Sequence, residues 1–111
     1  MDIINFNKKR ELLNKKMAGT DHFFELFGDL DTKVYADGTI PKKYKELTGL
    51  SISILTRCDE CILYHLQGCI KSGANKFEII EAIKIGVIGG GSITYPSARF
   101  AIKTMADLNI V

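Results

Sequence analysis

The fold class is decided by residues 41–73, which read PKKYKELTGLSISILTRCDECILYHLQGCIKSG. The first half opens with a proline, a residue that suits the first turn of a helix. Its apolar residues then recur at helical spacing and fall on one arc; they are Leu47, Leu50, Ile54 and Leu55. The second half ends at Gly73, a common helix stop. This stretch therefore predicts two helices, over about 41–56 and from 56–58 to 73, joined by a short connection.

The rest of the chain has similar periodicity, and no run alternates in the way that a strand requires. We expect further helices over about 7–17, from an N-cap at Thr20 to Gly28, from Asn75 to the triple glycine 89–91, and over 96–109. A loop is expected over residues 29–40, where Asp37-Gly38 is a turn signal. The sequence thus predicts an all-α bundle of five to six helices in a single domain, residues 1–111.

The segment that follows Asn75 is apolar on nearly every side. From Phe77 to the triple glycine its only charged residues are Glu78, Glu81 and Lys84. A helix of this kind has to be buried, and a bundle of 111 residues has little room to cover one completely. We therefore expect a subunit interface to cover part of it.

Composition excludes several classes of protein. A chain of 111 residues with 46% hydrophobic and 25% charged residues is typical of one soluble globular domain. Its net charge of +2 is too balanced for a dedicated nucleic-acid binder or a membrane-surface protein. Its three cysteines are too few, and odd in number, for a disulfide-stapled secreted fold. No run has the length of a signal peptide or of the ~18 apolar residues of a membrane span. We expect a cytoplasmic protein without nucleic-acid or membrane partners.

The sharpest chemical feature is the motif CDECILYH at residues 58–65, a C-x2-C-x3-H pattern. On a helix its two sulfurs and its imidazole fall within an arc of about 60°. Cysteines three residues apart can close a disulfide within one turn, and the start of a helix favours a thiolate. His65 lies one turn after Cys61, where it can accept the thiol proton or stabilise the thiolate. The motif predicts a redox-active dithiol formed by Cys58 and Cys61.

Glu46 is the next candidate, twelve positions before Cys58 on the preceding predicted helix. A short connection makes the two helices neighbours, so this carboxylate can reach the cysteine-bearing helix and orient His65 or take a proton through water. On spacing alone, a solvated surface residue beside three lysines is the favoured interpretation; these are Lys42, Lys43 and Lys45.

Two other interpretations of the cysteines remain open. Cys69 shares the arc of the motif, but roughly 16 Å of straight helix separates it from Cys58, too far for two ligands of one zinc ion. The first three motif residues could still bind zinc with a ligand from elsewhere, or the thiols could simply pack in a scaffold. Cys69 by itself is expected to pack inside. We expect no cofactor and no resident metal.

With these residues the chain resembles the alkyl hydroperoxidase D-like (AhpD-like) branch of the carboxymuconolactone decarboxylase family. The motif of that branch is E-x11-C-x-x-C-x3-H, and it is matched here by Glu46, Cys58, Cys61 and His65. The similar stretch covers roughly residues 40–109. The resemblance implies an all-helical fold, assembly as homotrimers or homohexamers, and a dithiol that cycles to a disulfide.

The resemblance also implies roles for these residues. Cys61 would be the attacking thiol, activated by His65 and Glu46, and Cys58 would close the disulfide. The substrate would be a hydroperoxide or a disulfide, with a lipoyl-type or thioredoxin-like reductant and a peroxiredoxin as partners. The position at the helix start by itself favours Cys58 as the low-pKa thiol, whereas the imidazole favours Cys61. The chain departs from the characterised peroxidase at Glu60, where that enzyme has a second histidine.

Lactone decarboxylation is the alternative activity. It is the less favoured one, because decarboxylase members of the family generally lack the C-x-x-C pair.

Overall fold

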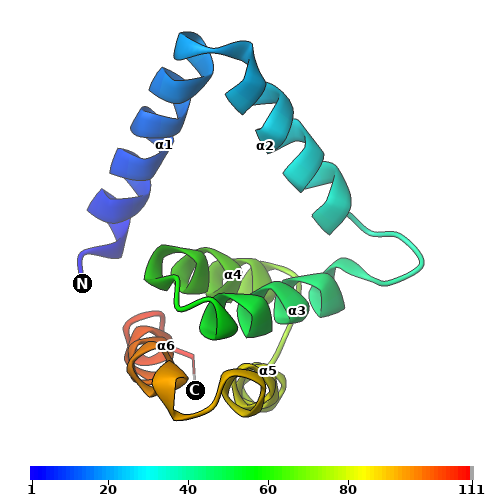
Figure 1. Ribbon diagram of the computed structural model, residues 1–111, viewed down its shortest axis with the longest axis vertical. Coiled ribbons are helices and arrows are strands. Elements are labelled where there is room, and N and C mark those ends of the chain that lie inside the picture. Colours follow the sequence, from blue (N-terminus) through cyan, green and yellow to red (C-terminus); the bar gives the residue numbers. More distant parts are fainter. Residues whose placement is uncertain (111) are drawn as a thin grey trace. The chain divides into compact units, whose positions relative to one another are not determined.

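The computed structural model describes residues 1–110, which form six α-helices and one 3-10 helix (Figure 1). These are α1 (Ile3–Thr20), α2 (His22–Tyr35), α3 (Lys42–Leu55), α4 (Asp59–Lys71), α5 (Lys76–Gly90), η1 (Ser92–Thr94) and α6 (Tyr95–Asp107). No strand occurs among the described residues. The predicted all-α fold is confirmed. The chain divides into two compact units, one of residues Met1–Ala36 and one that begins at Asp37.

The first unit contains α1 and α2, and no residue of either helix is buried. Both helices begin with an aspartate cap. The Asp2 carboxylate accepts a hydrogen bond from the backbone N–H of Asn5 at 3.1 Å, and that of Asp21 accepts one from Phe23 at 2.8 Å. The expected N-cap at Thr20 is therefore wrong. Thr20 is the last residue of α1, and its hydroxyl donates back to the Lys16 carbonyl at 2.8 Å.

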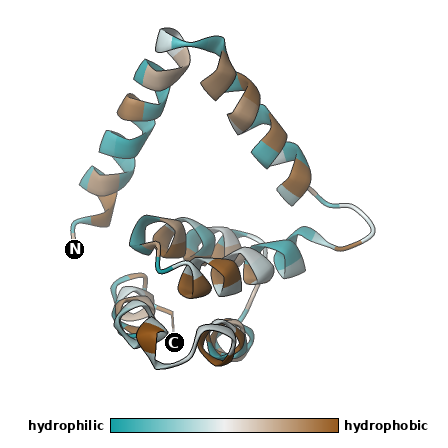
Figure 2. Ribbon diagram, viewed as in Figure 1, coloured by the Kyte–Doolittle hydropathy of each residue, from teal (hydrophilic) through white to brown (hydrophobic). Residues whose placement is uncertain are grey.

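The loop expected over residues 29–40 is also wrong in its first half, because α2 continues to Tyr35. Leu30 and Val34 extend the apolar stripe of Phe23 and Phe27 at helical spacing, and apolar bands recur along α2 in Figure 2. That periodicity outweighs Gly28, which a helix tolerates at a cost of about 1 kcal/mol.

The second unit is built around one apolar core supplied by α3, α4, α5 and α6. The core residues are Leu50, Ile54, Ile62, Leu66, Cys69, Ile79, Ala82, Ile83, Ala101 and Met105. Helix α3 is central to this unit, because it packs against both α4 and α5. The predicted apolar segment after Asn75 forms α5; its inner side is buried, whereas Ile85 and Ile88 are 63% and 86% exposed.

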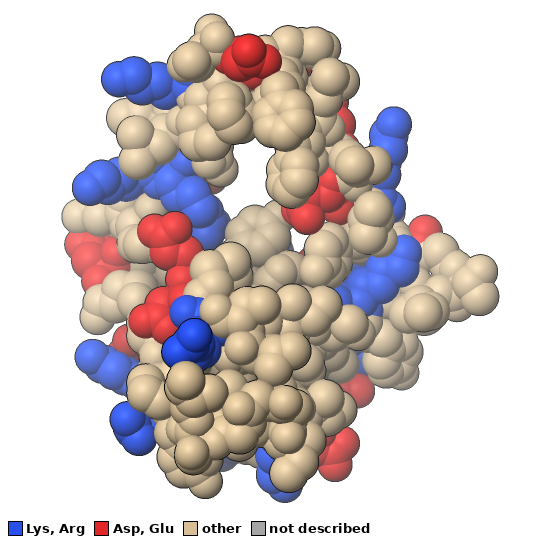
Figure 3. Space-filling model, viewed as in Figure 1, with Lys and Arg blue, Asp and Glu red and all other residues tan. Residues whose placement is uncertain are grey.

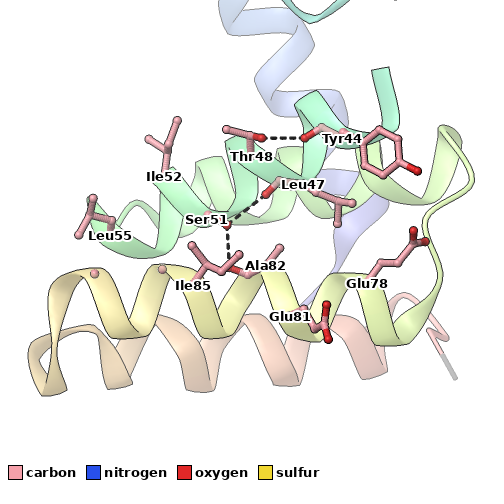
Figure 4. A pocket seen from close by; sticks show the side chains of 12 residues that line it. Tyr44, Leu47, Thr48, Ser51, Ile52, Leu55, Glu78, Glu81, Ala82 and Ile85 are labelled. Atoms are coloured by element: carbon pink, nitrogen blue, oxygen red, sulfur yellow. Dashed lines mark hydrogen bonds between the residues drawn. The ribbon is translucent and has the colours of Figure 1, made fainter. Parts of the chain in front are cut away.

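Helices α3 and α5 approach each other closely at Gly86. A Cβ atom at this position would lie 2.6 Å from the Cβ of Ile54 and 2.7 Å from the carbonyl oxygen of Ser51. The Ser51 hydroxyl also donates across the helix pair to the carbonyl of Ala82 at 2.7 Å (Figure 4). The missing side chain therefore sets the distance between the two helices.

A salt bridge joins the same two helices near the start of each. The Nζ atom of Lys43 lies 3.0 Å from Oε2 of Glu78. The other oxygen of Glu78 accepts the backbone N–H of Asn75 at 2.9 Å and completes a capping box. The hydrogen bond from Asn75, followed by that from Lys43, lowers the pKa of the Glu78 carboxyl.

We expect Gly86→Ala to destabilise the protein by about 1–3 kcal/mol, because the new methyl group must displace Ile54 or the α3 backbone. Gly89→Ala is the matched control on the same helix. A Cβ there would meet only Leu55 Cδ1 at 3.8 Å, so we expect a gain of up to about 1 kcal/mol from helix propensity. Urea unfolding followed by circular dichroism measures both, and equal effects would contradict the close packing.

Candidate functional site

The connection between α3 and α4 places the first cysteine at a helix start. Arg57 adopts a left-handed conformation, with φ of 57°. Its backbone N–H donates to the Ile54 carbonyl, and that of Cys58 donates to the Ser53 carbonyl, both at 3.1 Å. This pattern is that of a Schellman motif, which ends α3 and reverses the chain at once. Cys58 consequently becomes the N-cap of α4.

Cys58 and Cys61 are joined by a disulfide in the first turn of α4, with their Cα atoms 5.2 Å apart. The sulfur of Cys58 accepts a hydrogen bond from the backbone N–H of Cys61 at 3.2 Å. After reduction, this N–H group and the positive end of the helix dipole would stabilise a thiolate at Cys58. Cys61 is exposed and Cys58 is half-buried, so a reagent in solution reaches Cys61 more readily.

A buried carboxylate on α3 contacts an imidazole on α4, four residues after Cys61. Oε2 of Glu46 is 3.0 Å from Nδ1 of His65, and their side chains are 4% and 12% exposed. Because an ionised carboxylate can only accept, we assign the ring hydrogen to Nδ1, which leaves Nε2 as an acceptor. The other oxygen of Glu46, Oε1, lies 3.1 Å from Nζ of Lys42. Both oxygens of the buried carboxylate thus have partners.

The structure therefore brings Glu46 and His65 together, on neighbouring helices, and buries the carboxylate. The interpretation of Glu46 as a solvated surface residue is wrong. Glu60, which stands where the characterised peroxidase has a second histidine, is exposed in the first turn of α4. The catalytic roles of the four motif residues remain predictions.

Gly68 is a site residue that the sequence interpretation missed. It lies three residues after His65 on α4, and a Cβ there would overlap Oε2 of Glu46 and lie 2.5 Å from its Cδ. The bare backbone at Gly68 is what leaves space for the carboxylate. A glycine inside a helix, one turn beyond the motif histidine and on its side, is the signal that could have identified it.

The third cysteine lies on the same helix in a different environment. Cys69 is fully buried and unpaired in the core, as the sequence predicted. Burial, with a smaller contribution from Glu46, raises the pKa of its thiol to about 12. Among residues 1–110, no group of three or more His, Cys, Asp or Glu side chains is arranged to hold a metal ion.

A groove of about 630 Å³ runs between α3 and α5, and none of the four motif residues lines it. Its floor is mostly apolar, with Tyr44, Glu78 and Glu81 near one end (Figure 4). The groove is therefore a separate surface feature. On the face drawn in Figure 3, positive and negative side chains are interspersed. No helix in the described part of the chain is long and apolar enough to cross a membrane.

Comparison with known proteins identifies the family. The family model named carboxymuconolactone decarboxylase matches residues 21–104. The chain belongs to the carboxymuconolactone decarboxylase family. A crystal structure of a family member from Thermotoga maritima, for which involvement in an antioxidative response has been suggested, is 40% identical. The two align with a TM-score of 0.90 over 95% of this chain and 90% of the other.

Two further relatives are more distant. A family member from Legionella pneumophila is 24% identical and shares the fold, with a TM-score of 0.79 over 93% of this chain and 89% of the other. An uncharacterised protein of Cupriavidus necator is 30% identical over 70 residues, or 63% of this chain. This chain spans about three fifths of that relative, since the match covers 59% of its length.

We expect two of the three thiols of the reduced, native protein to react with iodoacetamide at pH 8, and the third to react only after unfolding. The pKa of Cys69 is higher in the folded protein than in the unfolded chain. The protonated thiol therefore makes its full contribution to the free energy of unfolding below pH 9. It is lost as the pH rises from 9.0 towards about 12. Intact mass should show two adducts in the native protein and three in urea. Three rapid adducts without urea would contradict the burial of Cys69.

Proposed function

We propose that this protein is a thiol–disulfide oxidoreductase of the AhpD-like type, which reduces hydroperoxides or relays electrons to a peroxiredoxin. The observation that carries the proposal is a disulfide at the start of α4 with a buried carboxylate–imidazole pair at His65, four residues further along the same helix. The antioxidative role suggested for the similar Thermotoga maritima protein supports it.

In the oxidative half-reaction, the thiolate of Cys61 attacks the terminal oxygen of the hydroperoxide. The O–O bond breaks, the alkoxide leaves and takes a proton to become an alcohol, and Cys61 becomes a sulfenic acid. The thiolate of Cys58 then attacks the sulfur of Cys61, and hydroxide leaves as water after protonation. The dithiol and hydroperoxide are thereby converted into a disulfide, an alcohol and one water molecule.

His65 moves the protons in this scheme. Its Nε2 accepts the proton of the Cys61 thiol, one turn away on α4, and later returns a proton to the leaving oxygen. Glu46 keeps the hydrogen on Nδ1 and stabilises the imidazolium that forms. Because Glu60 occupies the place of a second histidine, His65 carries the proton transfer alone.

A dithiol donor of the lipoyl or thioredoxin type closes the cycle. One of its thiolates attacks the Cys58–Cys61 disulfide, and its second thiolate releases the mixed disulfide, so that two electrons pass to this protein. The exposure of Cys61 supports attack at that sulfur.

We expect Cys61→Ser to abolish the oxidation of the reduced protein by cumene hydroperoxide, because the attacking sulfur is gone. Cys58→Ser should still react once and accumulate a sulfenic acid at Cys61 that dimedone labels. Intact mass before and after one equivalent of hydroperoxide measures both: the wild type loses two hydrogens, and Cys58→Ser gains one oxygen. The assignment fails if Cys61→Ser is oxidised at the wild-type rate.

We also propose that the chain assembles as a homotrimer or homohexamer with α5 in the interface. Ile85 and Ile88 support this proposal, because they form an exposed apolar ridge with an apolar groove on each side. A second copy of the chain presents the same surface, so the ridge of each copy can pack into a groove of the other.

Sedimentation equilibrium should therefore give a mass of three or six chains for the wild type. Ile88→Glu should lower that mass, because it places a charge on the ridge. A wild-type mass of one chain at micromolar concentration would refute the assembly.

A further inference from the structure

Lys42, at the start of α3, belongs neither to the motif of the family nor to the proton transfers described above. We propose that Lys42 is a positioning residue of the dithiol site: its ammonium holds one oxygen of Glu46 so that the other stays on His65. This inference rests on the proposed function and adds to it a residue that acts through Glu46.

The argument begins with the burial of Glu46, whose side chain is 4% exposed. A carboxylate in such a place is costly unless each of its oxygens has a partner. Lys42 supplies the partner of Oε1 at 3.1 Å, and His65 supplies that of Oε2 at 3.0 Å. Because the two oxygens share one planar group, fixing Oε1 also fixes the direction in which Oε2 points.

Gly68 restricts the position of the Glu46 carboxylate from a third side. The carboxylate lies against the bare backbone of α4, in space that a Cβ at Gly68 would occupy. The group is therefore held by a cation on its own helix, an imidazole on the next helix and a wall of backbone. Lys42 is the one of these three that joins the buried site to solvent, with a side chain that is 42% exposed.

The tautomer of His65 depends on this arrangement. In water the neutral imidazole prefers to carry its hydrogen on Nε2. With the hydrogen there, Nε2 could not accept the proton of the Cys61 thiol. A charged, correctly oriented carboxylate at Nδ1 reverses that preference. Without the cation on Oε1, the carboxylate of Glu46 can rotate away from His65, and it then loses its hold on the Nδ1 hydrogen.

A purely structural role for Lys42 makes a different prediction. A Lys–Glu pair four residues apart on a helix stabilises that helix slightly and has no effect on a ring on another helix. The nitrogen of His65 that carries the hydrogen therefore distinguishes the two roles, whereas the stability of the protein does not.

The experiment uses protein labelled with ¹⁵N at its two histidines, and His22→Gln assigns the second signal. Ring ¹⁵N shifts, recorded where the imidazole is neutral, should show hydrogen on Nδ1 of His65 in the wild type. Lys42→Met should shift the ring towards the Nε2–H form, and Glu46→Ala should do the same. Lys42→Arg should keep the wild-type signal, because it retains the cation. Lys71→Met, on the exposed end of α4, is the control for the loss of one positive charge.

Reactivity is the second readout. We expect Lys42→Met to slow the oxidation of the reduced dithiol by hydrogen peroxide at pH 7 about tenfold, with Lys42→Arg and Lys71→Met within about twofold of the wild type. Gly68→Ala should displace the same carboxylate, because its new methyl group would overlap it. This variant should show the Nε2–H signal although Lys42 is intact.

The outcomes separate the two proposals. A Lys42→Met ring signal equal to that of Lys71→Met overturns the positioning role, whatever the peroxide rates are. A wild type that hydrogen peroxide and cumene hydroperoxide do not oxidise overturns the peroxidase function, while the ring signals still decide the role of Lys42. Should Lys42→Met unfold, Lys42→Gln, which also removes the cation, carries the same decision: an Nε2–H signal supports the positioning role and a wild-type signal overturns it.

Discussion

The site depends on one constraint, the burial of a carboxylate between two helices. Glu46 is 3% exposed, and this burial explains which residues surround its carboxylate. Lys42 and His65 supply partners for its two oxygens, and Gly68 supplies the space. A buried charge with complete partners is rigid, because any movement of the carboxylate leaves at least one polar group without a partner. That rigidity fixes the imidazole of His65, four residues after Cys61 on α4.

A second constraint acts at the start of α4. A residue other than glycine in the left-handed region costs about 1–2 kcal/mol, and Arg57 is held there by the hydrogen bonds that end α3. The reversal is so abrupt that Cys58 caps the next helix directly. A longer connection would satisfy the same helices but would free the cysteine from the cap. The backbone strain and the thiolate-stabilising position therefore arise from the same short turn.

The helices of the second unit could be predicted from periodicity, because each one packs an apolar stripe into a shared core. The loop prediction is wrong over residues 29–35 because the turn signal lies only at Asp37-Gly38, whereas the apolar residues before it keep helical spacing. In the site, spacing alone placed Cys58, Cys61 and His65 on one side of a helix. Spacing could not decide whether Glu46 faced solvent or His65, because that depends on how α3 is rotated against α4. The positions of Lys42 and Gly68 beside Glu46 depend on the same rotation. Neither residue could therefore be assigned to the site from the sequence.

The three cysteines of α4 show how much a helix position changes one type of side chain. Cys58 and Cys61 lie in the first turn, where backbone N–H groups and the helix dipole favour the anion, and they form the disulfide. Cys69 lies two to three turns further along, among apolar side chains, where burial raises its pKa to about 12. Oxidation needs a thiolate, so the same helix holds a pair suited to redox chemistry and a thiol protected from it. The protected thiol cannot exchange with the disulfide while α4 stays folded, and this confines oxidation to the C-x-x-C pair.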